Sequence, residues 1–212
     1  MSVMGPDADL GELCARAMEA GREIDLSGCP YGETTGPCAF IKRPTNYYFF
    51  LAGFVRVLGL KRILEIGTNY GGSIMSMSKG LRPADVSSSR LVTIDLVSKN
   101  DEKLGAYLNI TRIHGDSLDE AVIKKAARAF HGKKIDLIFI DSLHEYEHTK
   151  QNIEVYASLL DPRFLILDDI RQNDGMRLLW KDLESGSAGE AFDASDTAVR
   201  KGAGFGVIRR AA

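Results

Sequence analysis

ILEIGTNYGGS, residues 63–73, sets a short apolar run directly before a cluster of glycines. A run of this length that ends in glycine is typical of a buried strand followed by a tight turn. Glycines allow the backbone unusual φ values and a close approach to a ligand, and the start of a helix offers free N–H groups. The stretch therefore predicts a first strand that runs into a ligand-binding turn.

Further short apolar runs follow at regular intervals and alternate with helical windows. The runs are LVTIDL (91–96), LNITRIHG (108–115), IDLIFID (135–141) and FLILDD (164–169). Between and after them lie predicted helices near 117–130, 145–160 and 174–183; the first is expected to open with a capping box from Ser117 to Glu120. Strands that alternate with helices predict a parallel sheet that is covered on both faces.

The two ends of the chain have a different character. At the start we expect a helix over Asp9 to Ala20 with Gly21 as its C-cap, then a lid from Ser27 to Thr45, and a buried helix over Asn46 to Leu58 that Gly59 ends. At the end, EAFDAS (190–195) and GFGVIRR (204–210) read as two strands without a crossover, hence antiparallel. We predict a single domain: an N-terminal helix and lid over 1–45, and a ligand-binding domain over 46–212.

Composition limits the class of protein. The chain has 212 residues, a net charge of −2, 44% hydrophobic and 26% charged residues, which suits one globular domain. Scattered basic residues argue against nucleic acid as a partner, and no apolar run reaches the roughly 18 residues of a membrane span. Three cysteines without regular spacing favour a reducing, cytoplasmic setting.

Acidic residues end the second and third predicted strands. Asp95 is placed to accept hydrogen bonds from both ribose hydroxyls of a nucleoside, and Asp116 from an adenine amino group. Asp116 has an alternative role as a helix cap, and the glycine turn can serve packing alone. The turn is not G-x-G-x-x-G, because Asn69 stands at the second glycine position, so pyrophosphate binding is disfavoured. Together the strand ends suggest an adenosine pocket.

On these motifs the chain, from about Asn46 to Arg210, resembles the class I S-adenosylmethionine-dependent methyltransferases. It is most similar to the metal-dependent small-molecule O-methyltransferases, which include catechol O-methyltransferase, macrolide-sugar O-methyltransferases and enzymes labelled cephalosporin hydroxylase. The resemblance implies an α/β fold with a Rossmann-like seven-stranded sheet, five parallel strands plus a C-terminal antiparallel pair, with helices on both faces. It also implies a set of residues that bind S-adenosylmethionine, namely Glu65, Gly67, Thr68, Asn69, Gly71, Ser73, Asp95, Asp116 and Ser117.

Three carboxylates end the fourth and fifth predicted strands: Asp141, Asp168 and Asp169. In a parallel sheet they should meet at one edge, where mutual repulsion favours a divalent cation, and oxygen ligands suit Mg²⁺. The resembling families carry acids at these places, so we assign the three to Mg²⁺ or another divalent cation. The alternative for Asp168 and Asp169 is a solvated loop.

His144 follows Asp141 by three positions, and the macrolide-sugar enzymes have D-x-x-H here, while catechol O-methyltransferase has a lysine at the same offset. Histidine titrates near neutral pH, so His144 is the candidate general base that accepts a proton from a substrate hydroxyl. The alternative is a structural residue at a helix start.

HEYEH, residues 144–148, also matches H-E-x-x-H, the pattern of zinc proteases. No third histidine lies at the extended spacing, and a zinc site would leave Asp141, Asp168 and Asp169 without a role. We therefore expect Mg²⁺-assisted, S-adenosylmethionine-dependent O-methylation of a small hydroxylated molecule, a sugar or phenol of secondary metabolism. The alternatives are a metal-independent N- or C-methyltransferase, a zinc hydrolase and a non-catalytic nucleoside-binding module; a homo-oligomer is an open option.

Overall fold

One seven-stranded sheet forms the centre of the protein. The structure is a computed structural model that describes residues 8–30, 45–97, 101–186 and 189–211. The strands lie in the order β3-β2-β1-β4-β5-β7-β6. Their bounds are β1 Arg62–Ile66, β2 Arg90–Asp95, β3 Ile110–His114, β4 Leu137–Ile140, β5 Phe164–Asp168, β6 Glu190–Asp193 and β7 Phe205–Arg209.

The direction of the strands confirms the predicted Rossmann-like sheet. Strands β1 to β5 pair in parallel, while β7 runs antiparallel to both β5 and β6. The chain order reverses beside β1, because β2 pairs with one of its edges and β4 with the other. In open parallel sheets a ligand crevice forms at such a point, outside the carboxyl ends of the strands.

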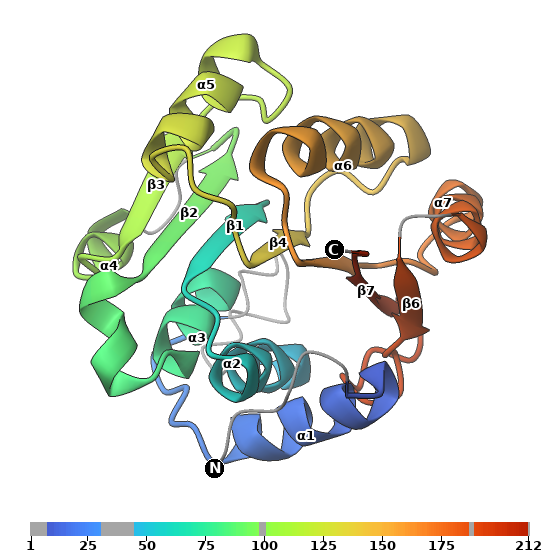
Figure 1. Ribbon diagram of the computed structural model, residues 1–212, viewed down its shortest axis with the longest axis horizontal. Helices are drawn as coiled ribbons and strands as arrows, with labels where there is room; N and C mark the ends of the chain where they lie inside the picture. Colours follow the sequence, from blue (N-terminus) through green and yellow to red (C-terminus); the bar gives the residue numbers. More distant parts are fainter. Residues whose placement is uncertain (1–7, 31–44, 98–100, 187–188, 212) are drawn as a thin grey trace, which may run out of the picture.

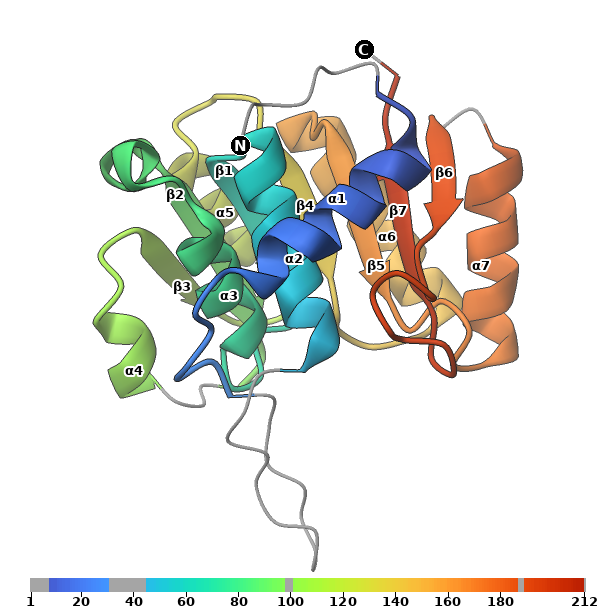
Figure 2. The same ribbon diagram turned by 90° about the horizontal axis from the view of Figure 1, so that it is seen from below.

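Helices cover both faces of the sheet, with α1, α2 and α3 on one face and α5, α6 and α7 on the other (Figure 1). Figure 2 shows α1 and α2 lying across the first of these faces. None of the described helices is long and apolar enough to cross a membrane. The helix bounds are α1 Leu10–Arg22, α2 Asn46–Leu58, α3 Gly72–Gly80, the 3-10 helix η1 Pro83–Ser88, α4 Asp101–Gly105, α5 Glu120–Ala129, α6 Tyr146–Leu160 and α7 Asp174–Ser185.

Each face of the sheet has its own apolar core. Under α1, α2 and α3 the core includes Phe50, Phe54 and Phe139, whereas under α5, α6 and α7 it includes Phe130 and Tyr156. The strand sequences are apolar on both sides, as a parallel sheet buried between two helical layers requires. The expected buried helix over Asn46 to Leu58 is confirmed, and Gly59 ends it in the left-handed conformation, with φ 64°.

Gly21 does not end α1, contrary to the expectation. Helix α1 continues to Arg22, and a Cβ added at Gly21 would lie 1.8 Å from the carbonyl oxygen of Phe49 in α2. In the same way a Cβ at Gly53 of α2 would lie 1.7 Å from the carbonyl oxygen of Ala17. The two glycines allow the backbones of α1 and α2 to pack in direct contact.

The expected capping box before α5 is also absent. The N-cap of α5 is Asp119, which makes no side-chain capping bond, and the helix begins at Glu120. Instead Oδ1 of Asp116 accepts a hydrogen bond from the Leu118 N–H at 2.9 Å. A hydrogen bond between the Asp116 side chain and the backbone two residues later is therefore found in place of the expected capping bond of Ser117. Most of the predicted lid, residues 31–44, lies outside the described residues, so the domain boundary at residue 45 stays a prediction.

Candidate active site

A pocket of about 550 Å³ lies at the carboxyl ends of β1, β2, β3 and β4. It lies where the chain order of the strands reverses, as expected for an open parallel sheet. It brings together five of the residues predicted to bind a cofactor and two of the predicted acid and histidine cluster. Its lining comprises Ile66, Gly67, Asn69, Ile94, Asp95, Leu96, Gly115, Asp116, Ser117, Asp141, Ser142, Leu143, His144 and His148.

The turn after β1 is shaped by a close backbone contact. Gly67 has φ 101°, and a Cβ there would lie 1.8 Å from the carbonyl oxygen of Asp141 at the end of β4. Asn69 has φ 44°, a left-handed conformation that asparagine tolerates better than most residues. Asn69 can therefore stand at the position of the second glycine of G-x-G-x-x-G, because an asparagine backbone can adopt the left-handed conformation that this turn requires.

Asp95 lies at the mouth of the pocket and is held there by backbone donors. Its Oδ2 accepts a hydrogen bond from the Asn69 N–H at 2.7 Å, and its Oδ1 accepts one from the Val97 N–H at 3.0 Å. Each carboxylate oxygen can accept further bonds, so the group can also bind hydroxyls. Two other lining residues, Leu96 and Leu143, are 73% and 53% exposed, so the pocket combines apolar side chains with an acid.

Glu65, Thr68 and Ser73 face the interior and do not line this pocket. Glu65 is fully buried; its Oε1 accepts a hydrogen bond from Ser73 Oγ and its Oε2 one from Thr93 Oγ1, each at 2.5 Å. Burial raises the pKa of Glu65 to about 8, although these two hydrogen bonds oppose the rise. The Thr68 hydroxyl lies 2.5 Å from that of Thr93. These residues connect β1, β2 and α3 and so support the turn from behind.

Gly71 likewise does not line the pocket. It is the N-cap of α3 and has φ 78°, and a Cβ there would lie 2.7 Å from the side chain of Leu104. Of the nine predicted cofactor residues, the pocket therefore brings together Gly67, Asn69, Asp95, Asp116 and Ser117.

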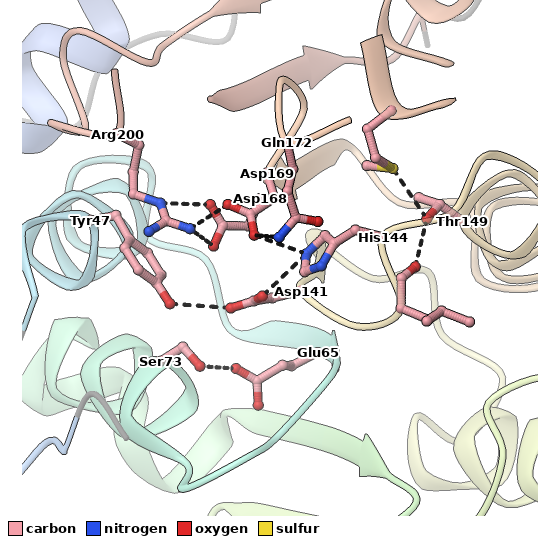
Figure 3. Close-up of polar contacts among 12 residues, drawn as sticks. Tyr47, Glu65, Ser73, Asp141, His144, Thr149, Asp168, Asp169, Gln172 and Arg200 are labelled. Atoms are coloured by element: carbon pink, nitrogen blue, oxygen red, sulfur yellow. Dashed lines mark hydrogen bonds and ion pairs between the residues drawn. The ribbon is translucent and has the colours of Figure 1, made fainter. Parts of the chain in front are cut away.

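The three predicted acids do meet at the ends of β4 and β5, and a basic residue lies among them (Figure 3). Nε of Arg200 donates to Oδ1 of Asp168 at 3.0 Å, and its Nη2 donates to Oδ2 of Asp168 at 2.6 Å and to Oδ1 of Asp169 at 2.5 Å. Asp141 Oδ2 accepts a hydrogen bond from the Tyr47 hydroxyl at 3.1 Å. The Arg200 guanidinium also lies over the Tyr47 ring, 5.0 Å from its centroid.

Burial controls the electrostatics of this group. It raises the pKa of Asp168 well above its usual value, Asp141 and Asp169 add to the rise, and Arg200 opposes it. Burial lowers the pKa of Arg200, but the Asp168 carboxylate more than compensates, so the guanidinium stays charged. Burial also raises the pKa of Tyr47 well above its usual value, which keeps its hydroxyl protonated as a donor to Asp141.

The expected Mg²⁺ ligand set is not assembled in this arrangement. Within the described ranges, no group of three or more His, Cys, Asp or Glu side chains is arranged to hold a metal ion. The physical reason is Arg200, whose donors use the Asp168 and Asp169 oxygens that an ion would need. Asp141, Asp168 and Asp169 are neighbours as predicted, but they surround a guanidinium.

His144 lies between two of these acids and also lines the pocket (Figure 3). Its Nε2 is 3.6 Å from Oδ1 of Asp141 and 3.5 Å from Oδ2 of Asp169, and this atom makes no hydrogen bond within the described part of the chain. The side chain of Asn173 donates to the His144 carbonyl oxygen at 2.8 Å. The Nε2 atom is therefore buried beside two carboxylates, while the His144 side chain as a whole is partly exposed and lines the pocket.

The H-E-x-x-H match does not form a zinc-protease helix. Helix α6 begins at Tyr146, so His144 precedes it, while His148 lies in its first turn. The His148 ring lies 3.3 Å from the side-chain nitrogen of Asn152, and His144 lies beside Asp141 and Asp169. The zinc hypothesis is wrong because the two rings do not share one helical face.

Tyr47 and Arg200 are the site residues that the sequence motifs did not reveal. Tyr47 belongs to the apolar helix α2, for which the sequence predicts only burial. Arg200 lies between β6 and β7 in a segment without any recognised motif. The alternating helices and strands do not reveal that this segment returns to the end of β5.

Comparison with known proteins supports the architecture. The putative caffeoyl-CoA O-methyltransferase from Staphylococcus aureus is 17% identical, with a TM-score of 0.64, over 80% of this chain and 85% of that one. TomG from Streptomyces achromogenes, an O-methyltransferase in complex with SAM, is 20% identical, with a TM-score of 0.61, over 96% and 92%. The MycE methyltransferase of the mycinamycin pathway, in complex with Mg and SAH, is 15% identical, with a TM-score of 0.52, over 95% and 54%.

These three similarities, all below 25% identity, concern the fold. No curated protein sequence matches the chain. A family model described as a methyltransferase domain matches residues 64–170, which run from within β1 to just past the end of β5 and include the whole lining of the pocket. Because this match covers just over half of the 212 residues, the chain belongs to the family of methyltransferase domains.

Proposed function

We propose that this methyltransferase uses S-adenosylmethionine to methylate a hydroxyl oxygen of a small molecule, a sugar or a phenol. The observation that carries the proposal is one pocket with two parts: Asp95 and Asp116 on one side, and Asp141 and His144 on the other. A nucleoside at the first part would leave the second part for the acceptor. TomG, crystallised with SAM, and MycE, crystallised with SAH, have the same fold.

The pocket residues fit the parts of S-adenosylmethionine. Asp95 is placed to accept hydrogen bonds from ribose hydroxyls, and Asp116 from the adenine amino group. The exposed side chains of Leu96 and Leu143 offer apolar contact to the planar base. When bound, S-adenosylmethionine supplies an electrophilic methyl group. The backbone N–H groups of the turn after Gly67 are then available to bind the methionine part of S-adenosylmethionine.

The acid and histidine cluster fits a proton acceptor. The His144 ring can take the proton of an acceptor hydroxyl, and the carboxylates of Asp141 and Asp169, each about 3.5 Å from its Nε2, stabilise the imidazolium that results. Tyr47 fixes Asp141 by its hydrogen bond of 3.1 Å. A histidine base beside a nucleoside pocket favours an oxygen acceptor, because a hydroxyl must lose its proton during transfer.

The Mg²⁺ that MycE holds does not fit the arrangement described here. Arg200 donates to two of the three expected ligands, so no step of the reaction is assigned to a metal ion.

The buried thiols of Cys14 and Cys29 are both free, which supports the proposed reducing, cytoplasmic setting.

Calorimetry with S-adenosylmethionine tests the cofactor, and transfer of a labelled methyl group to a panel of sugars and phenols tests the acceptor. We expect saturable binding of the cofactor and label on a hydroxyl oxygen. The absence of binding at millimolar cofactor would refute the cofactor assignment. Label found on nitrogen or carbon would favour the alternative of an N- or C-methyltransferase.

A further inference from the structure

The acid cluster contains its own cation. Asp168 is only 2% exposed, and its carboxylate receives two hydrogen bonds from Arg200 in a bidentate arrangement. The same guanidinium donates to Asp169, and the Arg200 side chain is itself only 17% exposed. A planar guanidinium matches two carboxylates in this way better than a flexible ammonium would.

The segment between β6 and β7 is built to deliver this side chain. The Arg200 N–H donates to the carbonyl oxygen of Ser195 at 2.8 Å, and the Gly204 N–H donates to that of Arg200 at 2.7 Å. The Ser195 hydroxyl accepts from the Phe205 N–H at 2.9 Å. Val199, directly before Arg200, has φ 58°, which is costly for a β-branched residue and persists only where surrounding contacts enforce it.

A divalent ion would compete with this arrangement. Mg²⁺ requires about six oxygen ligands at roughly 2.0–2.1 Å, and both oxygens of Asp168 and Oδ1 of Asp169 already accept hydrogen bonds from the guanidinium. The guanidinium and the ion would also repel each other, and burial weakens the screening by water. An ion at the Asp168 and Asp169 carboxylates would therefore have to displace the guanidinium or bind against its repulsion.

We propose that Arg200 takes the place of a divalent cation in this acid cluster, so that the chain binds no metal there and methyl transfer does not require one. Arg200 is then a positioning residue: it holds Asp169, whose Oδ2 is 3.5 Å from the Nε2 of His144. The kinetic part of this inference rests on the proposed function, whereas the metal-binding part does not.

The test uses Mn²⁺ as a probe, because it prefers oxygen ligands as Mg²⁺ does and its free ion is visible by electron paramagnetic resonance. Full-length protein freed of metal by a chelator is titrated as wild type, Arg200→Gln and Arg200→Lys. Arg171→Gln is the matched control, since Arg171 pairs with Asp193 at 2.5 Å outside the cluster. Circular dichroism establishes that each variant is folded.

We expect the wild type, Arg200→Lys and Arg171→Gln to show no saturable Mn²⁺ binding. Arg200→Gln should gain at least about tenfold in affinity for Mn²⁺, because a like charge has been removed, and Asp141→Asn added to it should abolish the gain. Saturable binding by the wild type that Asp168→Asn removes would overturn the proposal, whether or not the variants fold. A folded Arg200→Gln variant without gain would overturn it as well.

A second arm measures methyl transfer by the wild type after treatment with chelator. An unchanged rate is expected, and a rate that returns only with added metal would overturn the proposal. Calorimetry with S-adenosylmethionine runs in parallel. A wild type that binds neither cofactor nor Mn²⁺ would refute the proposed function alone, because the Mn²⁺ titration is independent of the cofactor.

Discussion

Two buried carboxylates, Glu65 at β1 and Asp168 at the end of β5, meet the same physical problem in different ways. Glu65 is fully buried and accepts hydrogen bonds from two hydroxyls, and burial raises its pKa to about 8. Asp168 is 2% exposed and forms an ion pair with the charged guanidinium of Arg200. The first acid is compatible with a bound proton at neutral pH, and the second has a fixed counter-charge. Burial alone therefore does not tell which role an acid has.

The two sides of the site follow from this difference. Around Glu65 the buried contacts are uncharged and support the turn that forms one wall of the pocket. Around Asp168 the contacts are ionic and hold acids beside His144. We expect variants on the first side to change ligand affinity or the pH dependence of stability, and variants on the second side to change turnover or the stability of an ion pair.

The largest effect is expected from His144→Ala. Loss of a general base lowers the rate constant of methyl transfer by roughly 10²–10⁴, while the affinity for S-adenosylmethionine, set on the other side of the pocket, stays as in the wild type. Single-turnover kinetics and calorimetry measure the two quantities. His131→Asn changes a histidine that does not line the pocket and is the control. An unchanged rate in His144→Ala would remove the base assignment.

Arg200→Met is expected to have the next largest effect. It removes one partner of a buried ion pair and leaves Asp168 without its counter-charge, a change that costs about 3–5 kcal/mol of unfolding free energy. Arg171→Met, which removes a more exposed pair with Asp193, should cost about 1 kcal/mol or less. Urea unfolding at pH 7 compares them. Equal losses of unfolding free energy in the two variants would contradict the claim that Arg200 is the counter-charge of a buried carboxylate.

Glu65→Gln tests the other carboxylate through pH. The pKa of Glu65 rises from an ordinary 4.5 to about 8 on folding, so between these values the unfolded state releases a proton that the folded state keeps. Its stabilising contribution is complete below pH 4.5 and is lost as the pH rises to 8, by about 1.4 kcal/mol per pH unit. The glutamine in Glu65→Gln does not ionise, so this pH-dependent contribution to the unfolding free energy is absent from the variant.

Urea unfolding from pH 4.5 to 8 measures this difference. The unfolding free energy of the wild type should fall relative to that of Glu65→Gln as the pH rises through this window. Parallel pH profiles would show that Glu65 ionises in the same way in the folded and unfolded states.

The smallest effect is expected from Asp95→Asn. Loss of a charged acceptor for the ribose hydroxyls costs about 1.5–3 kcal/mol, which is roughly a 10- to 150-fold rise in the Kd for S-adenosylmethionine. Asp174→Asn changes a fully exposed acid of α7 and is the control. Calorimetry measures both. A normal Kd in Asp95→Asn would place the ribose elsewhere and break the division of the site into two sides.

Local patterns in the sequence are sufficient for the architecture and for the place of the site. Apolar runs of strand length between helical windows predict a parallel sheet, and the carboxyl ends of parallel strands must lie at one edge. For that reason the strand ends alone predict that Asp95, Asp116 and Asp141 lie together, and the pocket contains all three. The resemblance to methyltransferases rests on the same strand ends.

Tertiary structure alone decided which partner each acid has. Tyr47 reaches Asp141 across 94 positions of sequence and Arg200 reaches Asp168 across 32, and neither pairing leaves a periodic pattern. In the same way Glu65 proved to face Ser73 and Thr93 rather than the pocket. The sequence determined the sheet and its acidic edge, because turn chemistry and apolar periodicity are local. The path of the chain between β6 and β7 determined that the cation at that edge is a guanidinium.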